Sequence, residues 1–290
     1  MDVVLPTTVD EVVAARVEQP AAAVLAGGTD LMVAVNAGAT RPEAVIALRT
    51  VAELATWRRE DDHLVIGAGV TYGQLLRSEL AELVPGLAHA SRTVGSPQIR
   101  NAGTIGGNLG TSSPAGDALP VLVALGATVE LAGPDGRRSL PMVEFATGPK
   151  RTALGPAEVI TGVRVPVTGG AQQYRKVGVR NAMVIAVASV ALSVDPGDRR
   201  VGVGLGSVGP VPLPAPEASA FAADAIDWAT GTLVDPAAAR RFGELVAAAA
   251  SPIDDHRSTA AYRRHAVAVL AERSLRTACA PGAPDREVAA

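Results

Sequence analysis

The sequence predicts an α+β protein of two domains, and three observations support this fold class. The chain has 290 residues, of which 48% are hydrophobic and 19% charged, so it is long enough for about two domains with buried cores. Strand and helix patterns alternate up to about residue 170, where Gly169 and Gly170 indicate a linker. Beyond this linker, several strand patterns precede several helical ones, which favours an antiparallel sheet with helices packed on it. We therefore expect domains at residues 1–170 and 171–290.

The first domain is expected to divide into subdomains of about residues 1–55 and 56–170. Residues 8–18 have helical periodicity after a Thr/Asp cap signal, and residues 22–26 and 41–49 read as strands on either side of a helix that starts near Asp30. The second subdomain is expected to follow with strands, helices and a hairpin. The expected ranges are a strand at 64–67, a helix capped by Thr71, a helix at 80–93, a helix running into a strand over 119–131, a turn at 134–136 and a strand at 159–167.

The second domain is expected to contain a three-stranded antiparallel sheet backed by helices. Its strand patterns lie at residues 174–180, 183–195 and 199–208, with Pro196–Asp198 as a hairpin turn. Helical segments are expected near residues 215–230, 235–248 and 259–277.

Charge and cysteine content exclude several classes of function. The net charge of −3 and the lack of a Lys/Arg run give no sign of nucleic-acid binding, and no apolar run reaches the ~20 residues of a membrane span. The N-terminal residues carry early acids and no basic segment, so we expect a cytoplasmic protein without a signal peptide. One cysteine, Cys279, cannot hold an iron–sulfur cluster alone, and the four histidines show no metal spacing.

Two glycine turns are the strongest candidates for a ligand site. The first, AGGTDL at residues 26–31, follows a strand; the second, GTIGGN at residues 103–108, lies in the stretch SPQIRNAGTIGGNLGTSSPAGD between Ser96 and Asp117. Paired glycines allow consecutive backbone N–H groups to point into one concavity that binds phosphate oxygens. Each turn alone is more often only a turn, but two such nests could grip the two phosphates of a pyrophosphate.

Other motifs are weaker. Gly204, Gly206 and Gly209 match a dinucleotide fingerprint, but prolines follow where the fingerprint needs a helix, so a tight strand end is the better interpretation. No nucleophile–base set and no Walker motif occur. Asp117 precedes an apolar helix; it is expected either to cap that helix or to accept hydrogen bonds from ribose or ribityl hydroxyls.

The order of several segments resembles the FAD-binding medium subunit of the molybdenum hydroxylases, the family of xanthine dehydrogenase and carbon monoxide dehydrogenase. AGGTDL, PQIRNAGTIGGN, GPKRTALGPAEVITGVRVP, YRKVGVRNAMVIAVASVAL and STAAYRRHAVAVLAER carry the resemblance over nearly the whole chain. It implies a two-part FAD-binding domain of the vanillyl-alcohol-oxidase (PCMH) type, followed by a small α+β domain.

The resemblance also implies a set of FAD-binding residues. The first pyrophosphate loop would be Ala26, Gly27, Gly28, Thr29 and Asp30 with Leu31 beneath it; the second would be Thr104, Gly106, Gly107 and Asn108; Thr111 and Asp117 would reach the sugar and ribityl hydroxyls; Ile160 would lie against the isoalloxazine; and Lys176, or neighbouring Arg175, would face the flavin. A positive charge near the flavin would raise its potential. Tyr174 is the aromatic candidate near the flavin.

The same resemblance implies the partners. A large subunit would carry the molybdopterin cofactor and a small subunit two [2Fe–2S] clusters, in a dimer of heterotrimers. This chain would then carry FAD and pass electrons from the clusters to an external acceptor, without catalytic side chains of its own. Two alternatives stay open: a self-contained FAD-dependent reductase or oxidase of the same superfamily, such as the UDP-N-acetylenolpyruvoylglucosamine reductase type, or a non-catalytic nucleotide-binding protein.

Overall fold

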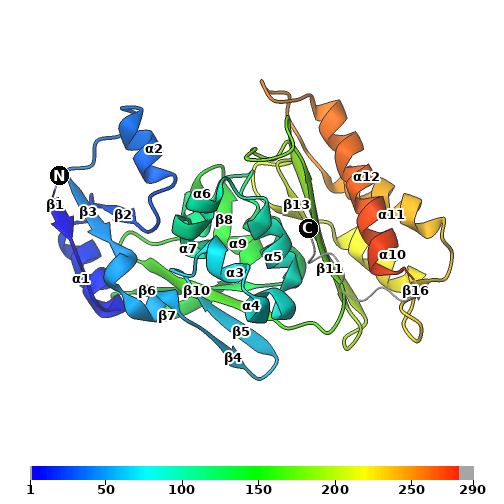
Figure 1. The fold of residues 1–290 in the computed structure, drawn as a ribbon, viewed down its shortest axis with the longest axis horizontal. Coiled ribbons are helices and arrows are strands. Elements are labelled where there is room, and N and C mark those ends of the chain that lie inside the picture. Colours follow the sequence, from blue (N-terminus) through cyan, green and yellow to red (C-terminus); the bar gives the residue numbers. More distant parts are fainter. Residues whose placement is uncertain (1, 281–290) are drawn as a thin grey trace.

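The computed structural model describes residues 2–280 and arranges three sheets in a row along its longest axis (Figure 1). A parallel sheet lies at the N-terminal end, an antiparallel sheet with short helices lies in the middle, and a second antiparallel sheet carries the C-terminal helices. Within residues 2–280, no helix is both long and apolar enough to cross a membrane.

The first sheet has three parallel strands in the order β1-β3-β2. Thr8 caps helix α1 through its side chain, which accepts a hydrogen bond from the Glu11 backbone, and α1 buries Val12 against Ile46 of β3. The elements of this part are β1 (Asp2–Val4), α1 (Val9–Glu18), β2 (Ala23–Leu25), α2 (Leu31–Asn36), β3 (Ala44–Ala47) and the short 3-10 helices η1 (Leu48–Thr50) and η2 (Ala52–Ala55). The expected strand, turn and helix around residues 22–31 are confirmed.

The middle sheet has five antiparallel strands in the order β4-β5-β10-β6-β7. The expected hairpin joins β6 to β7, and the expected cap at Thr71 forms a capping box with Gln74. The elements are β4 (Trp57–Glu60), β5 (His63–Gly67), α3 (Tyr72–Leu75), α4 (Ser78–Leu83), α5 (Pro85–Arg92), α6 (Pro97–Ala102), α7 (Ile105–Thr111), α8 (Ala118–Leu125), β6 (Thr128–Gly133), β7 (Gly136–Pro141), α9 (Met142–Phe145), β8 (Ala146–Gly148), β9 (Arg151–Thr152) and β10 (Val159–Pro166).

The C-terminal sheet has four strands rather than the three expected, in the order β11-β12-β13-β14. The fourth strand is a two-residue edge strand, Leu213–Pro214, paired with Gly204 and Leu205. Proline lacks an N–H group and is confined to sheet edges, so this proline-rich segment pairs as an edge strand. The elements are β11 (Gln172–Val177), β12 (Ala188–Asp195), β13 (Arg200–Gly206), β14 (Leu213–Pro214), α10 (Pro216–Ala225), β15 (Ile226–Asp227), β16 (Thr232–Leu233), α11 (Ala238–Ala249) and α12 (Ala260–Ala278).

Helix α8 forms the packing contact between the N-terminal region (residues 2–168), to which it belongs, and the C-terminal region (residues 172–280). It is buried along its whole length and packs on β12 and β13. A Cβ atom built on Gly202 would lie 1.8 Å from the carbonyl oxygen of Ala124, and one on Gly204 would lie 1.9 Å from that of Pro120. The glycines of the GLGSVG segment thus let a sheet approach a helix backbone. This agrees with the interpretation that the segment is not a dinucleotide fingerprint.

Candidate functional site

The first glycine turn leaves a row of backbone donors free. It connects the end of β2 to α2, and Gly28 has a φ of +71°, a conformation that glycine adopts without strain. The backbone N–H groups of Gly27 through Asp30 donate no hydrogen bond to any other described residue. Unpaired amides in a half-buried turn are costly unless something accepts from them, so this turn is suited to an anion with several oxygens.

The second glycine segment is a helix and not the loop nest that the sequence predicts. Thr104 caps α7, and its hydroxyl accepts a hydrogen bond of 2.9 Å from Gly107 N. The N–H groups of Ile105 and Gly106 donate to the carbonyls of Val70 and Ala68. The amides of Ile105, Gly106 and Gly107, at the start of α7, are therefore all used within the chain. A Cβ on Gly106 would lie 2.5 Å from that of Ala68, which explains why glycine stands in a helix here.

The two segments lie against each other although about 75 residues separate them. A Cβ on Gly27 would lie 1.7 Å from the carbonyl oxygen of Ala102, at the end of α6, so the first turn rests directly on the α6–α7 junction. The Thr111 hydroxyl donates a hydrogen bond of 3.0 Å to Asp30. The two segments thus lie side by side, with the free amides on the first turn and α7 packed against it.

Helix α7 also offers a hydrogen-bond acceptor. The Asn108 Oδ1 atom is buried and lacks a hydrogen-bond partner among the described residues. A Cβ on Gly107 would lie 4.0 Å from that of Ala26, so the gap between the segments opens at this glycine. Ile160, 6% exposed on β10, lies beside α7, and its Cδ1 atom would lie 3.7 Å from a Cβ on Gly110.

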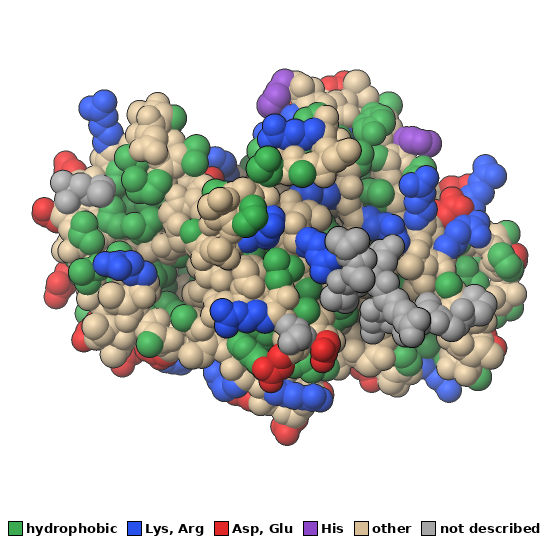
Figure 2. Space-filling model, in the orientation of Figure 1, with side chains coloured by type: hydrophobic (Ala, Val, Ile, Leu, Met, Phe, Trp, Pro, Cys, Tyr) green, Lys and Arg blue, Asp and Glu red, His purple; other side chains and the backbone are tan. Residues whose placement is uncertain are grey.

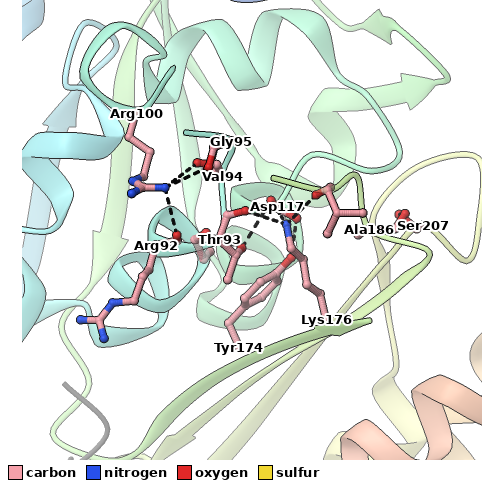
Figure 3. Close-up of polar contacts among 12 residues, drawn as sticks. Arg92, Thr93, Val94, Gly95, Arg100, Asp117, Tyr174, Lys176, Ala186 and Ser207 are labelled. Atoms are coloured by element: carbon pink, nitrogen blue, oxygen red, sulfur yellow. Dashed lines mark hydrogen bonds and ion pairs between the residues drawn. The ribbon is translucent and has the colours of Figure 1, made fainter. Parts of the chain in front are cut away.

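Asp117 and Lys176 form a buried ion pair where the two regions meet (Figure 3). Their side chains are 9% and 7% exposed, and Lys176 Nζ lies 2.7 Å from Asp117 Oδ2. The other Asp117 oxygen accepts a 2.6 Å hydrogen bond from the Tyr174 hydroxyl. Lys176 also donates to the carbonyls of Thr93 and Val184, so three acceptors satisfy its ammonium.

Burial and pairing act on these groups in opposite directions. Burial raises the pKa of the Asp117 carboxyl, while Lys176, Tyr174 and Thr93 counteract that rise. Burial, together with the nearby Asp117 carboxylate, raises the pKa of Tyr174 well above its ordinary value, so this phenol stays a hydrogen-bond donor near neutral pH. The Asp117–Lys176 ion pair carries no net charge, and the Tyr174 phenol is neutral.

The structure separates the sequence-derived site residues into two groups. Ala26 to Asp30, Thr104 to Asn108 and Thr111 converge on one gap, with Leu31 at the start of α2 beside it. Asp117 precedes α8 but makes no side-chain cap, because its carboxylate is directed to Lys176 and Tyr174. Arg175, the alternative to Lys176, instead donates to Thr277 of α12. Sequence reasoning missed Thr93, for which no local motif gives a signal.

Among residues 2–280, no group of three or more His, Cys, Asp or Glu side chains could hold a metal ion. The candidate site offers free backbone donors, one unpaired acceptor and one ion pair.

Comparison with known proteins identifies the family of the chain. Residues 1–168 match the model of the FAD binding domain in molybdopterin dehydrogenase, and residues 172–278 match the CO dehydrogenase flavoprotein C-terminal domain. The chain belongs to the FAD-binding medium subunits of the molybdenum hydroxylases. It is an oxidoreductase subunit, and FAD is the cofactor of the family's N-terminal domain.

Two relatives in this family match most of the chain. The carbon monoxide dehydrogenase medium chain of Afipia carboxidovorans is 33% identical over 262 residues, 88% of each chain. The glyceraldehyde dehydrogenase medium chain of Sulfolobus acidocaldarius is 30% identical over 256 residues, 87% of this chain and 89% of the relative. A chain in the structure of reconstituted CO dehydrogenase from Oligotropha carboxidovorans superposes with a TM-score of 0.88 at 30% identity, covering 97% of this chain and 98% of that one.

Proposed function

We propose that this chain is the electron-transfer subunit of a molybdenum hydroxylase, taking electrons from [2Fe–2S] clusters of a small partner subunit and passing them through FAD to an external acceptor. A large partner subunit would hold the molybdopterin cofactor and hydroxylate the substrate, in a dimer of heterotrimers in the cytoplasm. The observation that carries the proposal is the row of unpaired amides of Gly27 to Asp30, set against α7.

The residues present fit FAD. Phosphate oxygens only accept hydrogen bonds, and the amides of Gly27 to Asp30 with the Thr29 hydroxyl only need acceptors. The ribityl and ribose hydroxyls can donate to the orphaned Asn108 Oδ1. A dianion is thus held by neutral dipoles, without a lysine in the turn.

Within this mechanism the chain binds, orients and excludes water. FAD, when bound, supplies the redox chemistry. The amides of Gly27 to Asp30 would hold the pyrophosphate, and Ile160 would offer an apolar surface to the ring system. Thr111 orients the Asp30 carboxylate by a hydrogen bond. Asp117 and Lys176 are proposed to lie at the flavin end, where Lys176 would raise the flavin potential and the Asp117 carboxylate would moderate it.

The structure gives less support to the two alternatives. A self-contained reductase needs an acid or base that a substrate can reach, but Asp117, Tyr174 and Lys176 are buried and bonded to one another. A non-catalytic nucleotide-binding protein would bind FAD without redox turnover. Relatives named for carbon monoxide and for glyceraldehyde both match this chain, so we propose that the organic substrate is chosen by another subunit.

Flavin content tests the cofactor site. The purified complex is expected to be yellow and to release about one FAD per chain on denaturation. Gly107→Val should lower FAD occupancy at least about tenfold, which corresponds to ~1.4 kcal/mol of binding free energy, because its side chain enters the gap toward Ala26. Gly169→Val is the control, since no atom lies within 4 Å of a Cβ there.

Redox turnover tests the electron path. Adding the organic substrate to the complex should bleach the flavin absorbance, and an electron acceptor should restore it. A folded complex without flavin would contradict the site, and a flavin that never bleaches on substrate addition would contradict the electron path.

A further inference from the structure

Charge is unevenly distributed along this chain, whose net charge is −3. Residues 83–116 and 159–194 contain no Asp or Glu at all, yet they include several cations. These are Arg92, Arg100, Arg164, Arg175, Lys176 and Arg180. Arg164 is paired with Glu60 and Glu130, and Lys176 with Asp117. The cations of these segments that form no ion pair within residues 2–280 are Arg92, Arg100, Arg175 and Arg180.

The two segments meet at Lys176. Its Nζ atom donates to the carbonyl of Thr93, at 3.0 Å, and to that of Val184, at 3.1 Å, so the end of α5 and the loop after β11 lie on either side of it (Figure 3). Arg100 donates to the carbonyls of Arg92, Val94 and Gly95 and thereby fixes the turn between α5 and α6.

Apolar side chains are exposed on both segments. In the loop after β11, Val179 is 72% exposed, and Met183 and Ile185 are each 55% exposed. Ile99 of α6 adds a further exposed side chain. Arg92 and Arg180 are exposed beside them. Figure 2 shows Lys and Arg side chains gathered over the middle of the molecule, where the two regions meet.

The loop is held in place rather than loosely attached. The Ser207 hydroxyl donates to the Ala186 carbonyl at 2.9 Å, and the buried guanidinium of Arg263 donates to the Val187 carbonyl at 3.0 Å. A Cβ on Gly178 would lie 2.6 Å from a methyl carbon of Val184, so the two limbs of the loop touch. The protein thus fixes the backbone of a loop whose apolar side chains face solvent.

We propose that this surface, formed by Arg92, Ile99, Val179, Arg180, Met183 and Ile185 and called here the basic surface, is the docking site for an acidic face of the iron–sulfur subunit. Exposed aliphatic side chains together with Met and Arg have the composition of a protein interface. The exposed Arg92 and Arg180, without an acid in either segment, complement an acidic partner face. The inference rests on the proposed function, because it takes the partner from it. The basic surface adjoins Lys176, and an electron donor must be held close to the flavin.

Assembly of the complex from its separate subunits tests the inference. The dissociation constant between this chain and the two subunits encoded with it would be measured by biolayer interferometry at several salt concentrations. Val179→Asp and Arg92→Glu should each weaken assembly at least tenfold, and the affinity of the unaltered chain should fall as salt rises. Val234→Asp is the matched control, because Val234 is also 72% exposed but lies outside the basic surface.

Flavin content of each variant separates this inference from the function on which it rests. Val179→Asp and Arg92→Glu should retain FAD and the circular dichroism spectrum of the unaltered chain. If they bind the partners as tightly as Val234→Asp does, the docking proposal is wrong. If they assemble normally but slow electron transfer to a soluble acceptor, the basic surface serves that acceptor and the proposal is again overturned. Absence of FAD from the unaltered complex would instead refute the proposed function.

Discussion

The Asp117 carboxylate lies 2.7 Å from Lys176 Nζ and 2.6 Å from the Tyr174 hydroxyl. These two donors stabilise its charged form. Breaking a buried pair by removing one partner costs about 3–5 kcal/mol, because the remaining charge loses its compensation. Burial raises the pKa of this carboxyl and Lys176 opposes that rise. The pair therefore keeps a carboxylate ionised at a site that disfavours the charge.

Replacing Lys176 should make stability depend on pH. Without the ammonium, burial holds the Asp117 pKa further above its ordinary value of 3.8. The native state then keeps this proton to a higher pH than the unfolded chain, so its stability is highest at low pH and falls as the pH rises through the raised pKa. In urea unfolding, Lys176→Met should lower the free energy of unfolding by on the order of 3 kcal/mol at pH 8 and by less at pH 5.

Lys150→Met is the control for this prediction, since Lys150 is exposed and is the other lysine of the chain. It should unfold like the unaltered protein at both pH values. A loss of stability in Lys176→Met that is equal at pH 5 and pH 8 would show that the Asp117 proton plays no part.

Cys279 offers a second residue-scale prediction. It is 5% exposed at the end of α12, and burial raises the pKa of its thiol to about 11. At pH 8 only about one thiol in a thousand is then a thiolate, which is the reactive form. A chromogenic disulfide reagent should label the native chain at least about 100-fold more slowly than the chain in urea. Equal rates in both conditions would contradict this burial.

At the scale of elements, glycine has two different structural roles, and similar glycine-rich motifs in the sequence serve both. In the first turn, Gly28 has positive φ and its neighbours leave their amides free. In α7 and β13, Gly106 and Gly204 permit close approach of backbones. Turn chemistry predicts the first role but not the second, because the partner backbones, at Ala68 and Pro120, are distant in the chain. For this reason α7 was expected to be a loop nest.

A side chain at Gly204 should loosen the contact between α8 and the C-terminal sheet. The Cβ would lie 1.9 Å from the Pro120 carbonyl oxygen, so one backbone must move. Gly204→Val should lose at least about 3 kcal/mol of stability, at the upper end of the cost of overpacking, and lower the melting temperature accordingly. Gly197→Ala, in the β12–β13 turn, should change it little. Equal melting temperatures for the two variants would mean that α8 does not need this close approach.

At the scale of the whole molecule, the sequence predicts the order of elements well and their long-range pairing poorly. Helices α1 and α12 begin and end within one residue of their expected bounds, because caps and periodicity are local. Helix α10 ends at Ala225 instead of near residue 230, where the strand β15 follows, and α11 begins three residues later than expected. The expected strand at 183–195 begins only at Ala188, since Lys176 and Arg263 bind the backbone carbonyls of Val184 and Val187. The two glycine segments were expected to act together from their turn chemistry, and the family resemblance implied the same pairing. The pairing of Asp117 with Lys176 depends on how the two regions pack.

The two regions are expected to unfold together. Tyr174 and Ala191 of the C-terminal region belong to the hydrophobic cluster of the N-terminal region, and α8 is buried between the sheets. The two tryptophans lie one in each region, Trp57 on β4 and Trp228 after β15. Trp228→Phe and Trp57→Phe each leave one fluorescent reporter. Their urea midpoints should coincide with each other and with the loss of circular dichroism, as two-state unfolding requires.

Separate midpoints for the two tryptophan variants would show that the regions are independent folding units. In that case residues 1–168 expressed alone should bind FAD. With a shared core, the same fragment should instead expose α8, leave Asp117 without Lys176 and Tyr174, and fail to retain FAD. Cooperative unfolding would thus couple the cofactor site to the C-terminal region, since that region supplies the ammonium and the phenol that keep the Asp117 carboxylate in place.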